Sequence, residues 1–311
     1  MSEPVIAEMP VKVEEPVKVE SAATRLWHAI CENDHDTIRE IGPVPFESDV
    51  GERCLCGCPP DSLLDCLSSD GCNLSQFRIR MDTWKLLFDL GVVKSSDATL
   101  AYKIGSSLNT SERWVRFRDL LPYFDKEAVR DYRYGDSEDP IIRCIFYMCI
   151  SCDELVLSVL KYLVEECGCD VNSRCSRSRK TLETGDSLFE MLITNATPGV
   201  ISYVIDKVTD INYYGGHHGR GYCRPFAWLI HNLGHWLKRV EEGDYKDLTP
   251  AELAAEVERT VTDDLKIYEI LKAAGYSFEP DPRDKKSRTH KYYINKFNLV
   301  ARDARLAALL E

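Results

Sequence analysis

The stretches VLKYLVEECGCDVNSR (159–174) and VISYVIDKVTDINYYG (200–215) carry the same pattern. Each begins with apolar residues spaced along one face of a helix, then breaks, and then reads Asp-Val-Asn or Asp-Ile-Asn. Asp170 and Asn172 therefore correspond to Asp210 and Asn212, about 40 positions later. Self-similarity at such a period is typical of repeat proteins, so we predict that the chain is built from repeated helical units.

Two other stretches carry fainter copies of this pattern. YEILKAAGYSFEPD (268–281) has the same helix and break, with Gly275 at the expected C-cap, where a residue with positive φ commonly ends a helix. WKLLFDLGVVKSSD (84–97) is an earlier version, with Gly91 in the corresponding place. The repeated unit is therefore expected to extend well beyond the two clearest copies.

A second, shorter apolar helix is expected before each of these helices. Its six openings are TRLWHAI (24–30), DSLLDCL (61–67), ATLAYKI (98–104), DPIIRCI (139–145), DSLFEML (186–192) and RPFAWLI (224–230). An apolar residue stands two places after each opener: Leu26, Leu63, Leu100, Ile141, Leu188 and Phe226. Three places further on, the residues are small or apolar apart from one lysine: Ala29, Cys66, Lys103, Cys144, Met191 and Leu229. These positions are predicted to face the core.

Residues with known preferences for helix starts stand at several of these openings. Oxygen-bearing side chains that can cap free backbone N–H groups are Thr24, Asp61, Asp139 and Asp186. Prolines are expected at the first helical position, where a missing N–H costs little: Pro140 and Pro225.

This unit of two helices and a DVN corner resembles the ankyrin repeat, whose period is about 33 residues and whose opening reads Thr-Pro-Leu-His-x-Ala. TRLWHA keeps Thr24, Leu26 and Ala29 of that opening, and DPIIRC and RPFAWL keep its proline. No copy carries the full motif, and the openings recur at irregular intervals of 37 to 47 residues. We therefore predict an all-α fold, an irregular ankyrin-like solenoid of helix pairs with about six degenerate repeats over residues 23–281. An irregular α-solenoid of another family is the structural alternative.

The ends of the chain differ from this array. Residues 1–22 repeat PVKVEE and PVKVES, with prolines and no aromatic residue, so we predict a disordered tail. An insertion near 240–264, in which Thr249 and Pro250 form a helix start, is expected to lengthen or add a helix. Residues 282–311 are predicted to be a basic linker and a C-terminal capping helix, and a nuclear localisation element is the alternative for the basic run.

The net charge and the cysteine content indicate which partners and which cellular compartment to expect. The net charge of −12 opposes general binding to nucleic acid or anionic membranes. No apolar run approaches the roughly 20 residues needed to span a bilayer, and the N-terminus lacks a secretory signal. The 13 cysteines are therefore expected to be thiols in a reducing compartment. We predict a cytoplasmic protein, with a nuclear location as the alternative, and no membrane partner.

Two cysteine clusters could each be either a metal or redox site or a set of free thiols in a loop or turn. The stretch 54–72 holds five thiols that suffice in number for structural zinc: Cys54, Cys56, Cys58, Cys66 and Cys72. It lacks Cys-x-x-Cys spacing, so free thiols are favoured and a zinc-binding protein remains the alternative. In CGCDVNSRC (167–175), the matching repeat has Lys207, Val208 and Thr209 in place of the first cysteines, which favours a turn between helices over a metal or redox site.

Other motifs do not support catalysis. CISC, with Cys149 and Cys152, lacks the βαβ surroundings of a redox motif. HNLGH pairs His231 with His235 on one helix face, but Asn232 stands where a zinc protease has its glutamate base. We therefore predict a non-enzymatic protein without a cofactor or metal.

Three loops between repeats have an unusual composition: VRDYRYGDSED (129–139), NSRCSRSRKTLETG (172–185) and NYYGGHHGRGYCR (212–224). Their basic and aromatic residues are Arg130, Tyr132, Arg133, Tyr134, Arg174, Arg177, Arg179, Lys180, Tyr213, Tyr214, His217, His218, Arg220 and Tyr222. Tyrosine and arginine are enriched where proteins bind partners tightly. The ankyrin resemblance implies that such loops project side by side as a binding surface. We therefore predict a scaffold or adaptor that binds an acidic segment of a protein partner. Binding of RNA or single-stranded nucleic acid by the same loops ranks second, because the acidic body opposes it.

Overall fold

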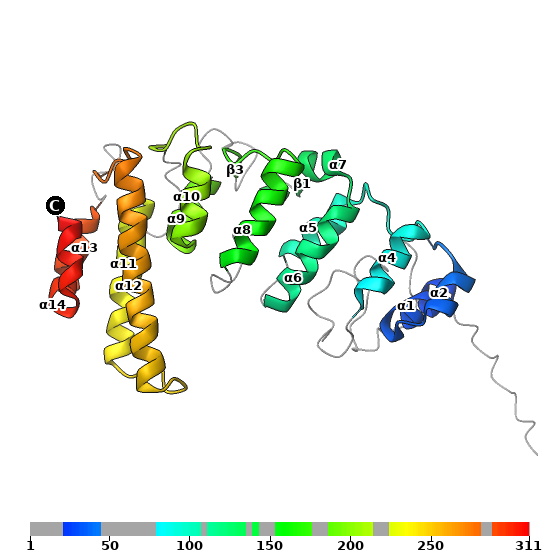
Figure 1. Ribbon diagram of the computed structural model, residues 1–311, viewed down its shortest axis with the longest axis horizontal. Helices are drawn as coiled ribbons and strands as arrows, with labels where there is room; N and C mark the ends of the chain where they lie inside the picture. The colour runs from blue at the N-terminus through cyan, green and yellow to red at the C-terminus, as the bar shows by residue number, and fades with distance from the viewer. Residues whose placement is uncertain are drawn as a thin grey trace, which may run out of the picture. The chain divides into compact units, whose positions relative to one another are not determined.

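The computed structural model describes residues 21–44, 79–106, 111–134, 139–142, 153–175, 186–213, 224–280 and 288–310. In these residues the chain is mostly helical, so the predicted all-α class is confirmed (Figure 1). The described residues up to Val92 belong to one compact unit, and those from Val93 onward belong to another. The sequence did not indicate a division at this point of the predicted array.

The described residues of the first unit form the helices α1 (Ala22–Glu32), α2 (His35–Ile41) and α4 (Met81–Asp89). Ser21 caps α1 by accepting a hydrogen bond from the Thr24 N–H at 3.1 Å. The prediction of Thr24 as the cap was therefore wrong: Thr24 is buried in the first turn of the helix. Asn33, which ends α1 with a φ of 56°, accepts hydrogen bonds from the Arg80 N–H and the Thr83 hydroxyl, both at 2.8 Å. These bonds fix the start of α4 against the end of α1.

The second unit holds the remaining helices. They are α5 (Ala98–Ser106), α6 (Ser111–Leu120), α7 (Lys126–Asp131), α8 (Asp153–Lys161), α9 (Leu188–Asn195), α10 (Pro198–Ile205), α11 (Pro225–Glu241), α12 (Pro250–Ala273), α13 (His290–Lys296) and α14 (Leu299–Arg302). A π-helical turn, Tyr162–Glu166, continues α8, and 3-10 turns cover Leu121–Tyr123 and Ala304–Leu310.

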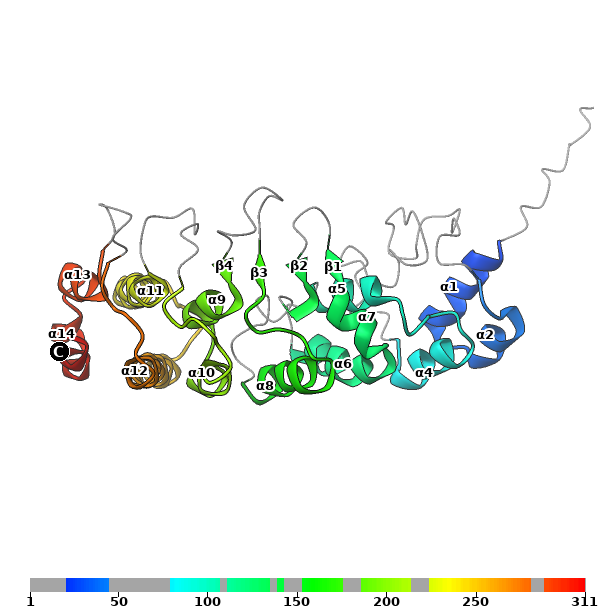
Figure 2. The ribbon, with the colours of Figure 1, turned by 90° about the horizontal axis from the view of Figure 1, so that it is seen from above.

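Figure 2 shows the later helices of this unit in two rows. Helices α9, α11 and α13 pack side by side in one row, and α6, α8, α10 and α12 pack in sequence order in the other. Across the rows, α9 packs on α10 and α11 packs on α12. Each of the helices α9 to α12 therefore contacts its partner in the pair and its counterpart in the neighbouring pair.

The predicted core position two places after each opener is buried wherever the structure describes it, which confirms the helical period read from the sequence. The residues concerned are exposed by 1% or less: Leu26, Leu100, Ile141, Leu188 and Phe226. Leu63 lies outside the described residues. Three places further on, Ala29 and Met191 are buried and Leu229 is half-buried, whereas Cys66, Cys144 and the Lys103 side chain lie outside the described part.

The predicted helix starts have mixed outcomes. Pro225 is the first residue of α11, as predicted. Thr249 caps α12 through a capping box, in which Glu252 accepts a hydrogen bond from the Thr249 N–H at 2.8 Å. The segment 240–264, predicted to be an insertion, falls within and between two long helices: α11 has 17 residues and α12 has 24.

Two of the predicted starts were wrong because the chain is extended there. Asp186 lies in strand β4, and the next residue, Ser187, caps α9 through a capping box with Glu190. Asp139 and Pro140 form strand β2 rather than a helix start. Asp61 lies outside the described residues.

Within the ranges that the structure describes, four strands of two residues each accompany the helices. Strand β1 (Arg133–Tyr134) pairs antiparallel with β2 (Asp139–Pro140), and β3 (Arg174–Cys175) pairs antiparallel with β4 (Asp186–Ser187). Strand β2 contacts β3, so the two pairs are neighbours. The sequence did not predict these strands, because a pair of residues is too short to show the alternation of a strand.

Candidate functional site

The two strand pairs hold the ends of two of the predicted contact loops. Register in the first pair places Arg133 opposite Pro140, and register in the second places Arg174 opposite Ser187. Because β2 contacts β3, the loops that leave these strands begin next to each other. The residues within the loops, 135–138 and 176–185, lie outside the described part of the chain.

The corner CGCDVNSRC forms where α8 and its π-helical turn end. Gly168 has a φ of +75°, and the Cys169 N–H donates to the Leu163 carbonyl at 2.8 Å, which closes the end of the helix. Cys167 and Cys169 on either side of this glycine are both buried. Burial raises the pKa of the Cys167 thiol to about 11 and that of the Cys169 thiol to about 12. Both side chains are therefore protonated at neutral pH and pack as apolar groups.

The asparagines of the DVN and DIN corners connect each corner to the next. The Asn172 carboxamide donates to the Lys207 carbonyl at 3.1 Å and accepts from the Thr209 N–H at 2.8 Å. The Asn212 carboxamide makes the same two bonds, to the Gly275 carbonyl at 3.2 Å and from the Ser277 N–H at 2.5 Å. The matching positions found in the sequence are thus equivalent hydrogen-bonding positions in the structure.

Among the predicted contact residues, Arg130 pairs with its neighbour. Its guanidinium donates to both carboxylate oxygens of Asp131, at 2.7 and 2.9 Å, and this lowers the pKa of Asp131. The Arg130 stem lies 3.7 Å from the position that a Cβ on Gly168 would occupy. The arginine therefore covers the corner, and its charge is compensated beside it.

Arg133 and Tyr132 also have partners within the chain. The Arg133 guanidinium donates to the carbonyls of Arg130 at 3.0 Å and Tyr132 at 2.7 Å, and so closes the end of α7. The Tyr132 ring lies 5.5 Å from the Tyr102 ring of α5, between centroids. These contacts hold the α7–β1 junction rigid at the root of the first loop.

The structure describes the predicted contact residues to different extents. It brings Arg130, Tyr132 and Arg133 together at the α7–β1 junction, and Tyr213 lies half-buried at the DIN corner. Tyr134 and Arg174 are described by their backbone alone, in β1 and β3. The remaining residues lie outside the described part: Arg177, Arg179, Lys180, Tyr214, His217, His218, Arg220 and Tyr222.

The histidine pair on α11 belongs to an aromatic cluster between α11 and α13. The ring centroids of His231 and His235 lie 4.6 Å apart, His231 lies 4.8 Å from Tyr293, and His235 lies 4.9 Å from Phe297. Burial lowers the pKa of His231, and His235 and Lys296 add to this effect. The pair therefore contributes to the packing of these two helices.

No group of three metal-binding side chains occurs within the described ranges. The thiols from Cys54 to Cys72, and also Cys149 and Cys152, lie outside those ranges.

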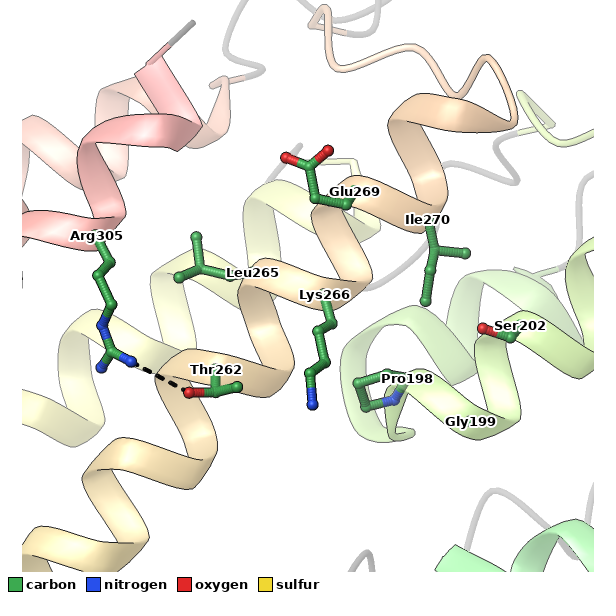
Figure 3. A pocket seen from close by; sticks show the side chains of 9 residues that line it. All are labelled: Pro198, Gly199, Ser202, Thr262, Leu265, Lys266, Glu269, Ile270 and Arg305. Atoms are coloured by element: carbon green, nitrogen blue, oxygen red, sulfur yellow. Dashed lines mark hydrogen bonds between the residues drawn. The ribbon is translucent and has the colours of Figure 1, made fainter.

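An open cleft of about 610 Å³ lies between α10 and α12 and was missed from the sequence (Figure 3). Its walls include Pro198 and Gly199 of α10, Leu265 and Ile270 of α12, and Arg305 near the C-terminus. These residues are widely separated along the chain and form no linear motif. The one signal in the sequence is that Leu265 and Ile270 are apolar positions on the helix that begins within the predicted insertion.

Among the described helices, none is both long and apolar enough to cross a bilayer. No family model, curated protein sequence or solved structure matches this chain.

Proposed function

We propose that this chain is a divergent ankyrin-type repeat protein that acts by binding another protein and not by catalysis. Three features support this: helices paired across two rows, short strand pairs between consecutive helix pairs, and corner asparagines that bond to the next corner. All three agree with the resemblance of the sequence to ankyrin repeats, in which the loops between repeats form a binding surface. The acting surface is therefore the set of loops at the strand pairs.

The observation that carries the proposal is the contact between β2 and β3. It brings the roots of two basic-aromatic loops together, so that Tyr134 and Arg174 open neighbouring loops. Neighbouring loops supply a larger surface than either alone, which is what a specific protein interface needs.

The partner proposed is an acidic segment of a protein. Arginine side chains pair with carboxylates through two parallel hydrogen bonds, and tyrosine adds rigid contact area. Arg130 and Arg133 are already engaged within the chain, so the contacts to the partner are assigned to the loop residues, above all Arg177 and Arg179.

A charge-reversal experiment tests the proposal. The variant Arg177→Glu/Arg179→Glu is compared with the wild type in affinity capture from a cell extract, followed by direct titration of each captured protein. The control variant is Lys85→Glu/Lys246→Glu, which makes the same change in net charge at two exposed lysines outside the loops. We expect the loop variant to bind at least about tenfold more weakly and the control to bind as the wild type does.

Two outcomes would contradict the proposal. Equal binding by the loop variant and the wild type would remove the loops from the interface. Binding of a mixed-sequence single-stranded oligonucleotide with a steep salt dependence would replace the protein partner by nucleic acid.

A further inference from the structure

The cleft between α10 and α12 has the properties of a groove for a short peptide. We define the α10–α12 groove by Pro198, Gly199, Ser202, Leu265, Lys266 and Ile270. Its volume of about 610 Å³ lies within the range of pockets that bind small ligands or side chains. In Figure 2, α10 and α12 belong to the row away from α9, and α9 is the helix that contacts β4. The groove is therefore a surface distinct from the loops of the proposed function.

The floor of the groove is apolar and accessible. Leu265 and Ile270 are half-buried, so each still presents apolar surface to the groove. No atom lies within 4 Å of the position that a Cβ on Gly199 would occupy. A ligand can therefore approach the backbone at the start of α10 closely, and a large apolar side chain can cover Ile270, which Figure 3 shows pointing toward α10.

The groove carries a positive charge that has no partner among the described residues. The Lys266 ammonium is exposed and makes no hydrogen bond or ion pair with a described residue. The start of α10 adds positive potential, because the Thr197 side chain does not cap the backbone N–H groups of the first turn. A carboxylate of a ligand is therefore favoured beside Lys266.

The other charges of the groove do not oppose this. Arg305 is engaged with Glu258 at 2.6 Å, and it also donates to Asp303 and Thr262. Figure 3 shows the Glu269 carboxylate pointing away from the Lys266 ammonium, on the other side of α12. Glu269 is therefore not directed at the place where a carboxylate would pair with Lys266.

We propose that the α10–α12 groove docks a partner peptide in which a large apolar side chain lies next to an acidic residue. The apolar side chain covers Ile270 beside Pro198 and Gly199, and the carboxylate pairs with Lys266. The unpaired lysine beside an apolar floor is the complementarity that selects this peptide over an uncharged or basic one.

Selection from a phage-displayed library of random dodecapeptides on the full chain tests the proposal. Peptides that also bind the Ser202→Trp variant are removed, since Ser202 is an exposed lining residue and tryptophan there fills the groove. The expected survivors contain Leu, Ile or Phe next to Asp or Glu. As synthetic peptides they should bind Lys266→Glu at least about fivefold more weakly than the wild type, and Lys266→Arg about equally.

Lys246→Glu is the matched control, because Lys246 is also exposed but lies in the connection between α11 and α12. It should leave peptide binding unchanged. The proposal is overturned if no selected peptide distinguishes Ser202→Trp from the wild type, if the selected peptides are basic, or if Lys266→Glu and Lys246→Glu act alike. Lys266 is exposed and unpaired, so its variants keep the test decisive should Ser202→Trp fail to fold.

Discussion

Asn172 and Thr209 are joined by a hydrogen bond of 2.8 Å, in which the Thr209 N–H donates to the Asn172 carboxamide oxygen. The same carboxamide donates to the carbonyl of Lys207. One side chain therefore satisfies an N–H and a C=O of the next corner, and Asn212 repeats the arrangement with Ser277 and Gly275. Asparagine recurs in the sequence because a carboxamide has both a donor and an acceptor.

The corner bonds are expected to stabilise the fold measurably. Asn172→Ala removes three bonds to the next corner, those with the Lys207 carbonyl, the Thr209 N–H and the Thr209 hydroxyl, and should lower the free energy of unfolding by about 1 kcal/mol, since these bonds are exposed. Denaturant titration measures this, and Asn212→Ala should behave alike. Asn295→Ala is the control at an exposed helical position, where alanine should change stability by less than about 0.5 kcal/mol. Equal losses in all three variants would show that the corner bonds contribute nothing specific.

The contact between α11 and α13 is expected to tolerate no added methyl group at Gly234. A Cβ there would overlap the Phe297 ring. Gly234→Ala should therefore destabilise the chain by about 1–3 kcal/mol in thermal or chemical unfolding, and Phe297→Leu should recover part of the loss. Gly199→Ala, where the added Cβ meets open space in a helix, should be neutral or stabilising by up to about 1 kcal/mol. A harmless Gly234→Ala would contradict the close approach of these helices.

Asp264 of α12 is expected to make stability fall as pH rises. Its carboxyl is buried, and burial raises its pKa well above the ordinary value of 3.8. At a pH between the ordinary pKa of the unfolded chain and the raised pKa of the folded chain, the folded chain holds a proton that the unfolded chain has lost. Raising the pH in this range therefore favours unfolding. Asp264→Asn removes this titration. Its stability relative to the wild type should increase with pH above 4, by up to about 1.4 kcal/mol per pH unit.

Glu256→Gln is the control for Asp264→Asn, because Glu256 is a carboxylate of the same helix that pairs with Arg259 at 2.6 Å. Its stability relative to the wild type should not increase in this way. A constant difference between Asp264→Asn and the wild type from pH 4 to pH 7 would show that Asp264 is ionised in the folded chain.

His290 is expected to make stability fall as the pH drops, which is the opposite of the effect of Asp264. Burial lowers its pKa from 6.5 to about 4, and its Nε2 lies 2.9 Å from the Leu309 carbonyl oxygen. Between those values the unfolded chain binds a proton that the folded chain does not, so stability falls as pH drops from 6.5 towards 4. Measured in Asp264→Asn, stability should fall by about 2 kcal/mol between pH 7 and pH 5. Adding His290→Phe should remove most of that fall, and an unchanged fall would contradict the assignment to His290.

The corner cysteines are expected to resist alkylation in the folded chain. With pKa values of about 11 and about 12 and buried side chains, Cys167 and Cys169 supply little thiolate at pH 8. Mass spectrometry of the peptide containing them, after iodoacetamide treatment at pH 8, should show labelling in denaturant and very little without it. Equal labelling in both conditions would show that the corner is open to reagents.

The sequence predicted those parts of the fold that rest on periodicity. Leu100, Leu188 and Phe226 were predicted to face the core and are buried, because a helix with one apolar face has a regular spacing. Helix starts were less predictable, since a serine one to three residues from the expected residue can take the same role: Ser21 caps α1 and Ser187 caps α9. The paired strands and the division near Val92 depend on contacts between distant segments, which a local pattern does not contain.

The candidate surfaces differ in how far the sequence could reveal them. The loops were predicted to be a binding surface from their amino-acid composition. Composition shows where arginines occur but not which groups they pair with. The structure shows that Arg130 is paired with Asp131 and that Arg133 closes α7, which moves the proposed binding role further into the loops. The α10–α12 groove combines segments 198–202 and 262–270 with Arg305, so it exists only once the chain has folded.

The bonds of Asn212 to Gly275 and Ser277 reach past the whole α11–α12 pair. The corner at which α12 returns therefore keeps its attachment although the pair has grown longer than its neighbours. Chain length at the far end of this pair, around residues 243–247, is consequently free to vary. A fluorescent protein or an affinity tag grafted there would leave both corners intact, which makes this tip the natural place for a label in any experiment on binding.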